Sequence, residues 1–198
     1  MEIPKDDARN RLLKAALNLF VSKGYEATSV SMIVQEANVT KPMLYYYFKN
    51  KEGIYTEIMN EAFTEFEEVI QRYPLKDVSA KDTIIIMFKE LMEIQEQNME
   101  YVRLIHAMVY GPPQGAPHID FEEFHTRMAN KIEVMLQTGI DNGELEDMGI
   151  KDFTTIILSI LFFCFDTRVI ECSIKMSVDD MQRLIDKIFD KILIKKEV

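Results

Sequence analysis

Residues 38–51 combine three lysines and three tyrosines with no acidic residue. The lysines are Lys41, Lys49 and Lys51, and the tyrosines are Tyr45, Tyr46 and Tyr47. Lysine ammonium groups pair with phosphates, tyrosine hydroxyls donate to phosphate oxygens, and tyrosine rings pack on thymine methyl groups. Three adjacent tyrosines taken alone are also typical of a core or surface aromatic cluster. Together with the local positive charge, they favour a surface that binds DNA.

The charge of the whole chain requires any such binding to be local. The 198 residues include 23 Lys and Arg against 33 Asp and Glu, a formal net charge of −10. Residues 1–53 hold eight basic and six acidic residues, a balance of +2, so the remainder carries −12. Because strongly acidic surfaces repel phosphates, the composition excludes a protein that coats nucleic acid over its whole surface.

Helical periodicity predicts three short helices around the basic stretch, over residues 7–23, 30–37 and 41–48. The turn between the second and third is short, and its Asn38 tolerates a positive φ. This layout is that of a helix-turn-helix, in which residues 41–48 form the recognition helix that enters the major groove.

Local signals define the ends and the orientation of these helices. Gly24 can end the first helix in the left-handed conformation, and Ser29 and Thr40 are expected to cap the next two. Leu44 and Phe48, four residues apart, are expected to anchor the third helix to the first helix and its neighbours. The residues then pointing away from the domain are Pro42, which falls in the first turn, and Met43, Tyr45 and Tyr46.

Helical periodicity continues through the rest of the chain, so the predicted fold class is all-α with about nine helices. Asn50 is expected to cap a linking helix over residues 50–72, which ends at Tyr73-Pro74. We expect a helix-turn-helix DNA-binding domain over residues 1–53 and a helical domain over 74–198. Further helices are expected at residues 80–97, 99–110, 119–141, 151–173 and 178–195.

The N-terminal part of the chain resembles the TetR family of transcriptional regulators over about residues 8–60. The resemblance is carried by residues 15–30, AALNLFVSKGYEATSV, and by residues 33–52, IVQEANVTKPMLYYYFKNKE. It implies a homodimeric DNA-binding regulator, usually a repressor released from a palindromic operator by a small effector. Two departures stand out: Tyr47 replaces a frequent histidine, and Asn38 replaces the commoner glycine of the turn.

The resemblance also implies which side chains contact double-stranded operator DNA. Lys41, Pro42 and Tyr45 correspond to residues near the bases, and Tyr47 and Lys51 to residues near the backbone. The full expected set is Thr28, Ser29, Ser31, Thr40, Lys41, Pro42, Met43, Tyr45, Tyr46, Tyr47, Lys49 and Lys51.

The C-terminal two-thirds is rich in methionine and phenylalanine, which is typical of a ligand-binding helical domain. Nine of the 13 methionines follow Pro74, and unbranched thioethers adapt to irregular ligands. The expected effector-binding residues, any of which could instead be plain core, are Phe66, Met87, Leu91, Met108, Phe121, Phe124, His125, Met128, Phe162, Phe165 and Asp166. Asp166 either orients a donor or cation of the ligand or forms a structural ion pair with Arg168 or Arg127, and the ion pair is favoured.

The helix over residues 151–173 is apolar nearly all round, so it must be buried on more than one side. We expect an effector pocket on one face and a dimer contact on another. The resemblance implies that the last two helices form a four-helix bundle across a two-fold axis. The expected interface residues are Ile157, Leu161, Met181, Leu184, Ile185, Ile188, Phe189 and Ile192.

No pattern of catalytic or metal-binding residues stands out, so we expect no enzyme activity, no cofactor and no metal. The histidines His106, His118 and His125 lack the i,i+4 spacing with one another that places two ligands on one helix face. Two rival interpretations remain: an all-α carrier or enzyme that uses the same cavity without DNA, and a helical adaptor for other proteins.

The sequence also predicts a cytoplasmic protein that does not enter the membrane. Its most apolar uncharged run, residues 153–165, is thirteen residues long, whereas a membrane span needs about 20. The N-terminus is polar and acidic. Cys164 and Cys172 would lie roughly 12 Å apart on one helix, too far for a disulfide, so we expect reduced thiols.

Overall fold

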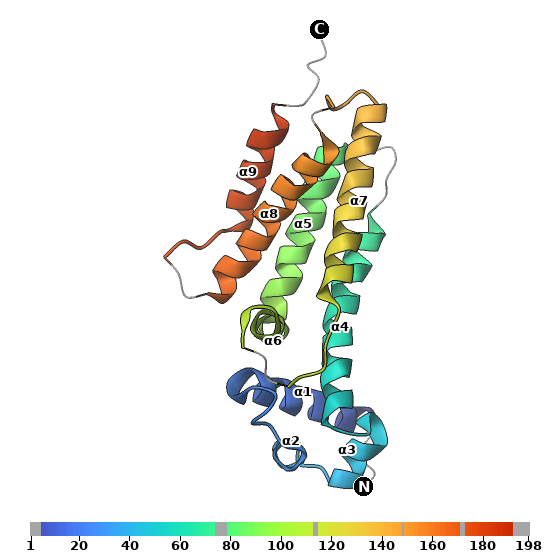
Figure 1. The fold of residues 1–198 in the computed structure, drawn as a ribbon, viewed down its shortest axis with the longest axis vertical. Helices are drawn as coiled ribbons and strands as arrows, with labels where there is room; N and C mark the ends of the chain where they lie inside the picture. Colours follow the sequence, from blue (N-terminus) through green and yellow to red (C-terminus); the bar gives the residue numbers. More distant parts are fainter. Residues whose placement is uncertain (1–4, 74–78, 113–114, 148, 171–172, 192–198) are drawn as a thin grey trace. The chain divides into compact units, whose positions relative to one another are not determined.

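The computed structural model describes residues 5–73, 79–112, 115–147, 149–170 and 173–191 (Figure 1). These residues form nine α-helices and no strand, which confirms the all-α class. They divide into two compact units, residues 1–64 with 98–119 and residues 65–97 with 120–198. None of the helices in the described ranges is both long and apolar enough to cross a bilayer.

The first unit contains α1 (Lys5–Lys23), α2 (Val30–Glu36), α3 (Lys41–Phe48), α6 (Met99–Tyr110) and the first part of α4 (Lys51–Arg72). Helices α2, α3 and α6 all pack against α1. The presence of α6 in this unit differs from the predicted division at residues 53 and 74. Its Leu104 is buried in the core of the first unit, which is why the helix belongs there.

Most of the predicted helix ends are confirmed. Gly24 and Asn38 adopt positive φ angles of 84° and 51°, and the Ser29 side chain accepts a hydrogen bond from the backbone N–H of Met32. Asn50 caps α4, where its Oδ1 accepts from the N–H of Gly53 at 2.7 Å. The predicted cap by Thr40 is wrong in part: its backbone is extended as a cap requires, but its side chain makes no capping hydrogen bond.

The core of the first unit anchors α3 as predicted. Leu44 and Phe48 are buried together with Ile33 of α2 and Leu12 and Phe20 of α1. At roughly 1.5–3 kcal/mol for each large apolar side chain removed from water, two such anchors fix the rotation of an eight-residue helix. The opposite side of α3 must therefore face solvent.

The second unit contains α5 (Ala80–Gln97), α7 (Phe121–Asp141), α8 (Ile150–Val169), α9 (Val178–Phe189) and the end of α4. Helices α5, α7, α8 and α9 lie side by side, with α5 in contact with the other three (Figure 1). Two predicted ends were too late, because α8 stops at Val169 and α9 at Phe189. The predicted continuation over residues 192–195 lies outside the described residues.

Gly53 is a close-contact point between α3 and α4. A Cβ atom added to Gly53 would lie 1.9 Å from the carbonyl oxygen of Phe48 and 3.0 Å from its carbonyl carbon. Both atoms belong to the backbone, so they cannot move aside as a flexible side chain could. Only glycine lets the chain pass directly from the end of α3 into α4.

This contact predicts the sign of a stability change. Replacing glycine by alanine inside a helix ordinarily stabilises it by about 0.5–1 kcal/mol. We expect Gly53→Ala instead to lower the free energy of unfolding by roughly 1–3 kcal/mol, because the added methyl group overpacks the junction. Urea unfolding measures the change, and Asn60→Ala, at an exposed position of the same helix, is the control. A Gly53→Ala protein more stable than the parent would contradict the assignment.

Candidate nucleic-acid interface and effector site

One side of α3 presents a continuous solvent-facing surface, here called the α3 face. It consists of Lys41, Pro42, Met43, Tyr45 and Tyr46. Tyr45 is 50% exposed and Tyr46 is 70% exposed, which is unusual for side chains of this size on a compact unit. The α3 face therefore offers one ammonium group, two phenols and apolar surface to a partner, as the sequence predicts.

The other residues near the end of α3 that are predicted to contact DNA differ in their exposure to solvent. Tyr47 is half-buried and packs against the core, with its ring centroid 5.1 Å from that of Tyr46. Lys49 is exposed and ends α3 with a φ of 64°. Lys51 is half-buried: its Nζ donates to the carbonyl of Tyr25 at 2.8 Å and lies 4.1 Å from the centroid of that ring. If a DNA phosphate bound Lys51, the ammonium group would have to contact it in addition to the carbonyl and the ring of Tyr25.

The predicted contacts beside α2 and the turn divide into buried and exposed side chains. Ser29, Ser31 and Thr40 are exposed, as a DNA contact requires. Thr28 is buried, and its hydroxyl donates to the carbonyls of Gly24 at 2.8 Å and Leu19 at 3.2 Å. The prediction that the Thr28 side chain contacts DNA is therefore wrong, because that side chain closes the turn between α1 and α2.

Arg9 contacts the buried anchor of α3, a role that was not predicted from the sequence. Its guanidinium pairs with Glu57 and, at 3.1 Å, with Glu61, both on α4. The same group lies 5.7 Å from the centroid of the Phe48 ring, the buried anchor of α3. The partners are 48 and 52 residues away in the chain, so no local sequence pattern announces them.

Six of the predicted effector residues meet in the second unit and form what we call the aromatic cluster. Its members are Phe66, Phe121, Phe124, His125, Phe162 and Phe165. The ring of His125 lies between Phe121 and Phe162, at centroid distances of 4.2 and 4.6 Å. Phe66 is buried and meets Phe124 and Phe165 edge to face at 6.3 and 6.0 Å. Edge-to-face packing of this kind is an arrangement that aromatic pairs prefer.

The other predicted effector residues have mixed positions. Met87, Leu91 and Met128 are buried in the second unit. Met108 lies on α6 and packs against the core of the first unit, apart from the aromatic cluster, and its effector role stays a prediction. The sequence around Met108 does not indicate which of the two units α6 packs into.

The favoured ion pair of Asp166 is also wrong. Arg168 donates to the carbonyl of Met92 at 3.0 Å and lies 3.8 Å from Glu96. Arg127 lies 2.8 Å from Glu67 and 3.7 Å from Glu123. Within the described residues, the carboxylate of Asp166 has no hydrogen bond or ion pair.

Gln95 is a polar residue of this region that the sequence analysis missed. Its side chain is fully buried, and its Nε2 donates to the backbone carbonyl of Phe165 at 3.0 Å. Its Oε1 has no hydrogen-bond partner. The signal was available, since Gln95 follows Leu91 at the i,i+4 spacing on the buried face of α5.

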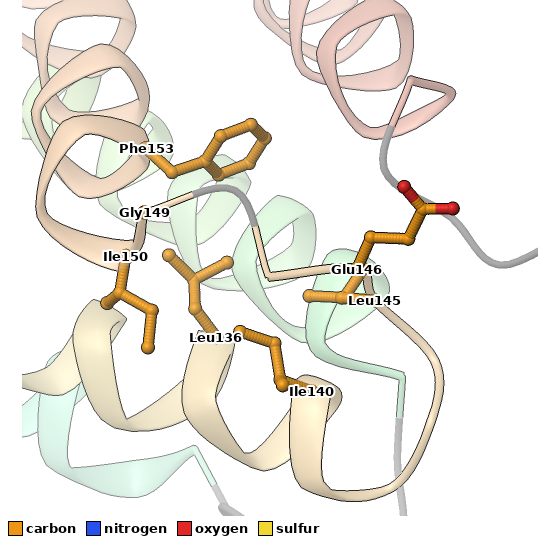
Figure 2. A pocket seen from close by; sticks show the side chains of 7 residues that line it. All are labelled: Leu136, Ile140, Leu145, Glu146, Gly149, Ile150 and Phe153. Atoms are coloured by element: carbon orange, nitrogen blue, oxygen red, sulfur yellow. The ribbon is translucent and has the colours of Figure 1, made fainter.

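Figure 2 shows an apolar hollow at the other end of α7 and α8 from the aromatic cluster. Leu136 and Ile140 of α7, Ile150 and Phe153 of α8, and the intervening turn line it. Its cavity volume of about 10 Å³ has room for one water molecule at most, so it is no pocket for an organic ligand. No predicted effector residue contributes to it.

Most predicted dimer residues fill the core of their own subunit. Ile157, Leu161, Met181, Ile185 and Phe189 are fully buried. They are corrected to core residues, because α8 and α9 pack on each other and on α5 through these side chains. Leu184 and Ile188 are half-buried, and Ile192 lies outside the described residues.

The apolar side chains that α8 leaves uncovered lie on another side of the helix. Ile156 is 46% exposed and Phe163 is 49% exposed, and half-buried Ile160 lies between them at helical spacing. Because α8 is apolar on nearly all sides, its sequence did not distinguish this surface from the core.

The described residues contain no group of three His, Cys, Asp or Glu side chains that could hold a metal ion. Cys164 is a buried free thiol, and burial raises its pKa to about 11. Cys172 lies outside the described residues.

Burial in the aromatic cluster lowers the pKa of His125 below its ordinary value of 6.5. The unfolded chain therefore takes up a proton first as the pH falls, and stability that is complete above about pH 6.5 declines below it. We expect His125→Phe to lose less unfolding free energy than the parent between about pH 7.5 and 5.5. Urea unfolding at both pH values measures this, with exposed His118→Gln as the control. Equal losses in the parent and His125→Phe would contradict the burial of this imidazole.

The comparisons with known proteins agree with this architecture. Residues 12–58 match the family described as bacterial regulatory proteins, tetR family. The chain is 29% identical over 50% of its length to the biofilm operon icaADBC HTH-type negative transcriptional regulator IcaR of Staphylococcus epidermidis, covering 54% of that protein. It is 35% identical over 36% of its length to the uncharacterized HTH-type transcriptional regulator YdgC of Bacillus subtilis, covering 36% of it. The chain thus aligns with about half or less of the length of these relatives.

A solved structure extends the likeness in fold beyond the N-terminal part. A putative fatty acid metabolism regulator of Clostridium perfringens superposes with a TM-score of 0.72 at 21% identity. The superposition covers 93% of this chain and 100% of that one. The helix-turn-helix within residues 12–58 thus matches the tetR family of bacterial regulatory proteins, and the fold beyond it resembles that of the Clostridium perfringens structure.

Proposed function

We propose that the protein is a transcriptional regulator that binds a palindromic operator as a homodimer and acts as a repressor released by a small, largely hydrophobic effector. The observation that carries this proposal is the α3 face, held outward by the buried anchors Leu44 and Phe48. A carrier or enzyme without DNA binding has no use for such a face and is not favoured.

The chemistry of the α3 face fits the major groove. The ammonium of Lys41 at the start of the helix can reach guanine O6 and N7 or a phosphate. The phenols of Tyr45 and Tyr46 can donate to phosphates or cover thymine methyl groups. The negative regulation named for the IcaR relative supports repression as the outcome.

The α3 face predicts which variants lose the operator. Lys41→Ala and Tyr45→Ala should each weaken operator binding at least tenfold, since a lost base contact costs roughly 1–3 kcal/mol and recurs in both subunits. Gel retardation on fragments retained by the parent protein from the DNA upstream of its own gene measures the loss. The control is Lys14→Ala, which removes the same charge from an exposed position of α1.

Both α3 variants should keep the oligomeric state and thermal unfolding midpoint of the parent. Parent binding should also weaken steeply with added salt, because phosphate contacts release counterions. Undiminished retardation by both variants would contradict the assignment of α3 as the recognition helix.

The proposed dimer rests on the uncovered apolar side chains of α8. Ile156 and Phe163 of α8 and half-buried Leu184 and Ile188 of α9 are the apolar side chains that we propose a second copy covers. If α8 and α9 of each subunit pack against those of the other across a two-fold axis, they form a four-helix bundle. Such a dimer carries two recognition helices, one for each of two successive major grooves.

Phe163→Glu should dissociate this dimer. Burying an unpaired charge costs about 3 kcal/mol or more, so the dissociation constant should rise by roughly 100-fold or more. Sedimentation velocity over a dilution series measures the constant. Ile86→Glu, at a 53% exposed position of α5, is the matched control and should remain dimeric. A Phe163→Glu protein that stays dimeric would place the interface elsewhere.

A further inference from the structure

We propose that the aromatic cluster, with Gln95 and Asp166, binds a flat hydrophobic organic cation that carries an N–H donor. The inference rests on the proposed function only in treating this cluster as the effector site. It assigns the chemical class of the ligand and the two side chains that select it.

The first observation is the orphaned acceptor of Gln95. A backbone carbonyl can only accept, so the side-chain atom facing Phe165 must be the amide nitrogen, at 3.0 Å. This fixes the amide orientation and leaves Oε1 as a fully buried acceptor without a donor. An unmet buried polar atom destabilises the folded chain, and a donor on the ligand would remove that cost.

The second observation is the unpaired carboxylate of Asp166. It is half-buried and lies one helical turn after Phe162, so the two side chains share one side of α8. The nearby arginines, Arg127 and Arg168, are bound to other partners, at 2.8 Å to Glu67 and at 3.0 Å to the carbonyl of Met92. The carboxylate therefore has no countercharge from either arginine.

The third observation is the form of the cluster itself. Phe66 and Phe124 are buried, whereas Phe121, His125, Phe162 and Phe165 are half-buried, so the cluster reaches from the interior to the surface. Aromatic ring faces attract cations, so the half-buried rings at the surface end of the cluster offer a flat cation a place to stack. His125 is neutral at pH 7, because burial lowers its pKa, so it adds no repelling charge.

These groups together favour a cation over an acid. Gln95 Oε1 and Asp166 are both acceptors, and neither can donate to a carboxylate. The long-range field has the same preference: residues 65–97 and 120–198 hold 14 Lys and Arg against 24 Asp and Glu, a net charge of −10.

Three probes with one ring framework test the assignment. 9-Aminoacridine is a cation with N–H donors at pH 7, acridine is uncharged, and anthracene-9-carboxylate is an anion. Calorimetric titration of the full chain without DNA should give an affinity for 9-aminoacridine at least tenfold above either of the others. Tighter binding of the anion, or no binding of the cation, would overturn the proposal.

Variants then locate the site. Asp166→Asn should weaken the cation roughly tenfold and leave acridine unchanged, because it removes the charge and keeps the shape. Asp152→Asn, which removes an exposed carboxylate from the first turn of α8, is the control. Gln95→Met should also weaken the cation, and Asp166→Asn carries the test if Gln95→Met does not fold. Cation binding unchanged in Asp166→Asn would refute the site.

The titration and the DNA experiment fail independently. A protein that does not retard DNA still gives an interpretable probe titration, because the titration contains no duplex. If the protein binds none of the three probes, the role of the α3 face can still be tested by gel retardation.

Discussion

The burial of Leu44 and Phe48 is the constraint on which the functional interpretation depends. These two side chains lie four residues apart on a helix of eight, so their burial fixes which side of α3 faces outward. Gly53 lets the chain turn directly into α4, and Arg9 holds the Phe48 ring from the other side. The α3 face thereby exposes Tyr45 and Tyr46 to solvent. Exposing these rings is unfavourable, and the burial of Leu44 and Phe48 in the core offsets that cost.

The distribution of charge separates the two kinds of ligand. Residues 1–64 and 98–119 together hold nine basic and nine acidic side chains, so the whole net charge of −10 belongs to the other unit. A neutral unit with a local basic helix can approach phosphates, whereas an acidic unit disfavours them. The same acidic unit favours cationic molecules, so the two proposed ligands, a polyanion and a small cation, are attracted to different units of the chain.

The local features could be predicted from sequence, and the tertiary ones could not. Gly24, Asn38 and the cap by Ser29 depend on a residue's own conformational preferences, and these predictions were confirmed. The pairing of Arg9 depends on a helix about 50 residues away in the chain, and the hydroxyl of Thr28 depends on how the turn folds back on the end of α1. Because α8 is apolar on nearly all sides, periodicity gave no basis for separating buried Ile157 from exposed Ile156. Six of the predicted effector residues do meet in one aromatic cluster, but their role as effector contacts stays a prediction.

The most direct test of the central claim is dimethyl sulfate protection of duplex that the protein retains from its own genome. The reagent methylates guanine N7 in the major groove and adenine N3 in the minor groove, so it reports which groove is occupied. Our account predicts protected guanine N7 atoms in two patches about one helical turn of 10–10.5 base pairs, or a multiple of it, apart. Adenine N3 should stay reactive within those patches. Protection confined to adenine N3, or guanine reactivity unchanged by bound protein, would contradict the placement of α3 in the major groove.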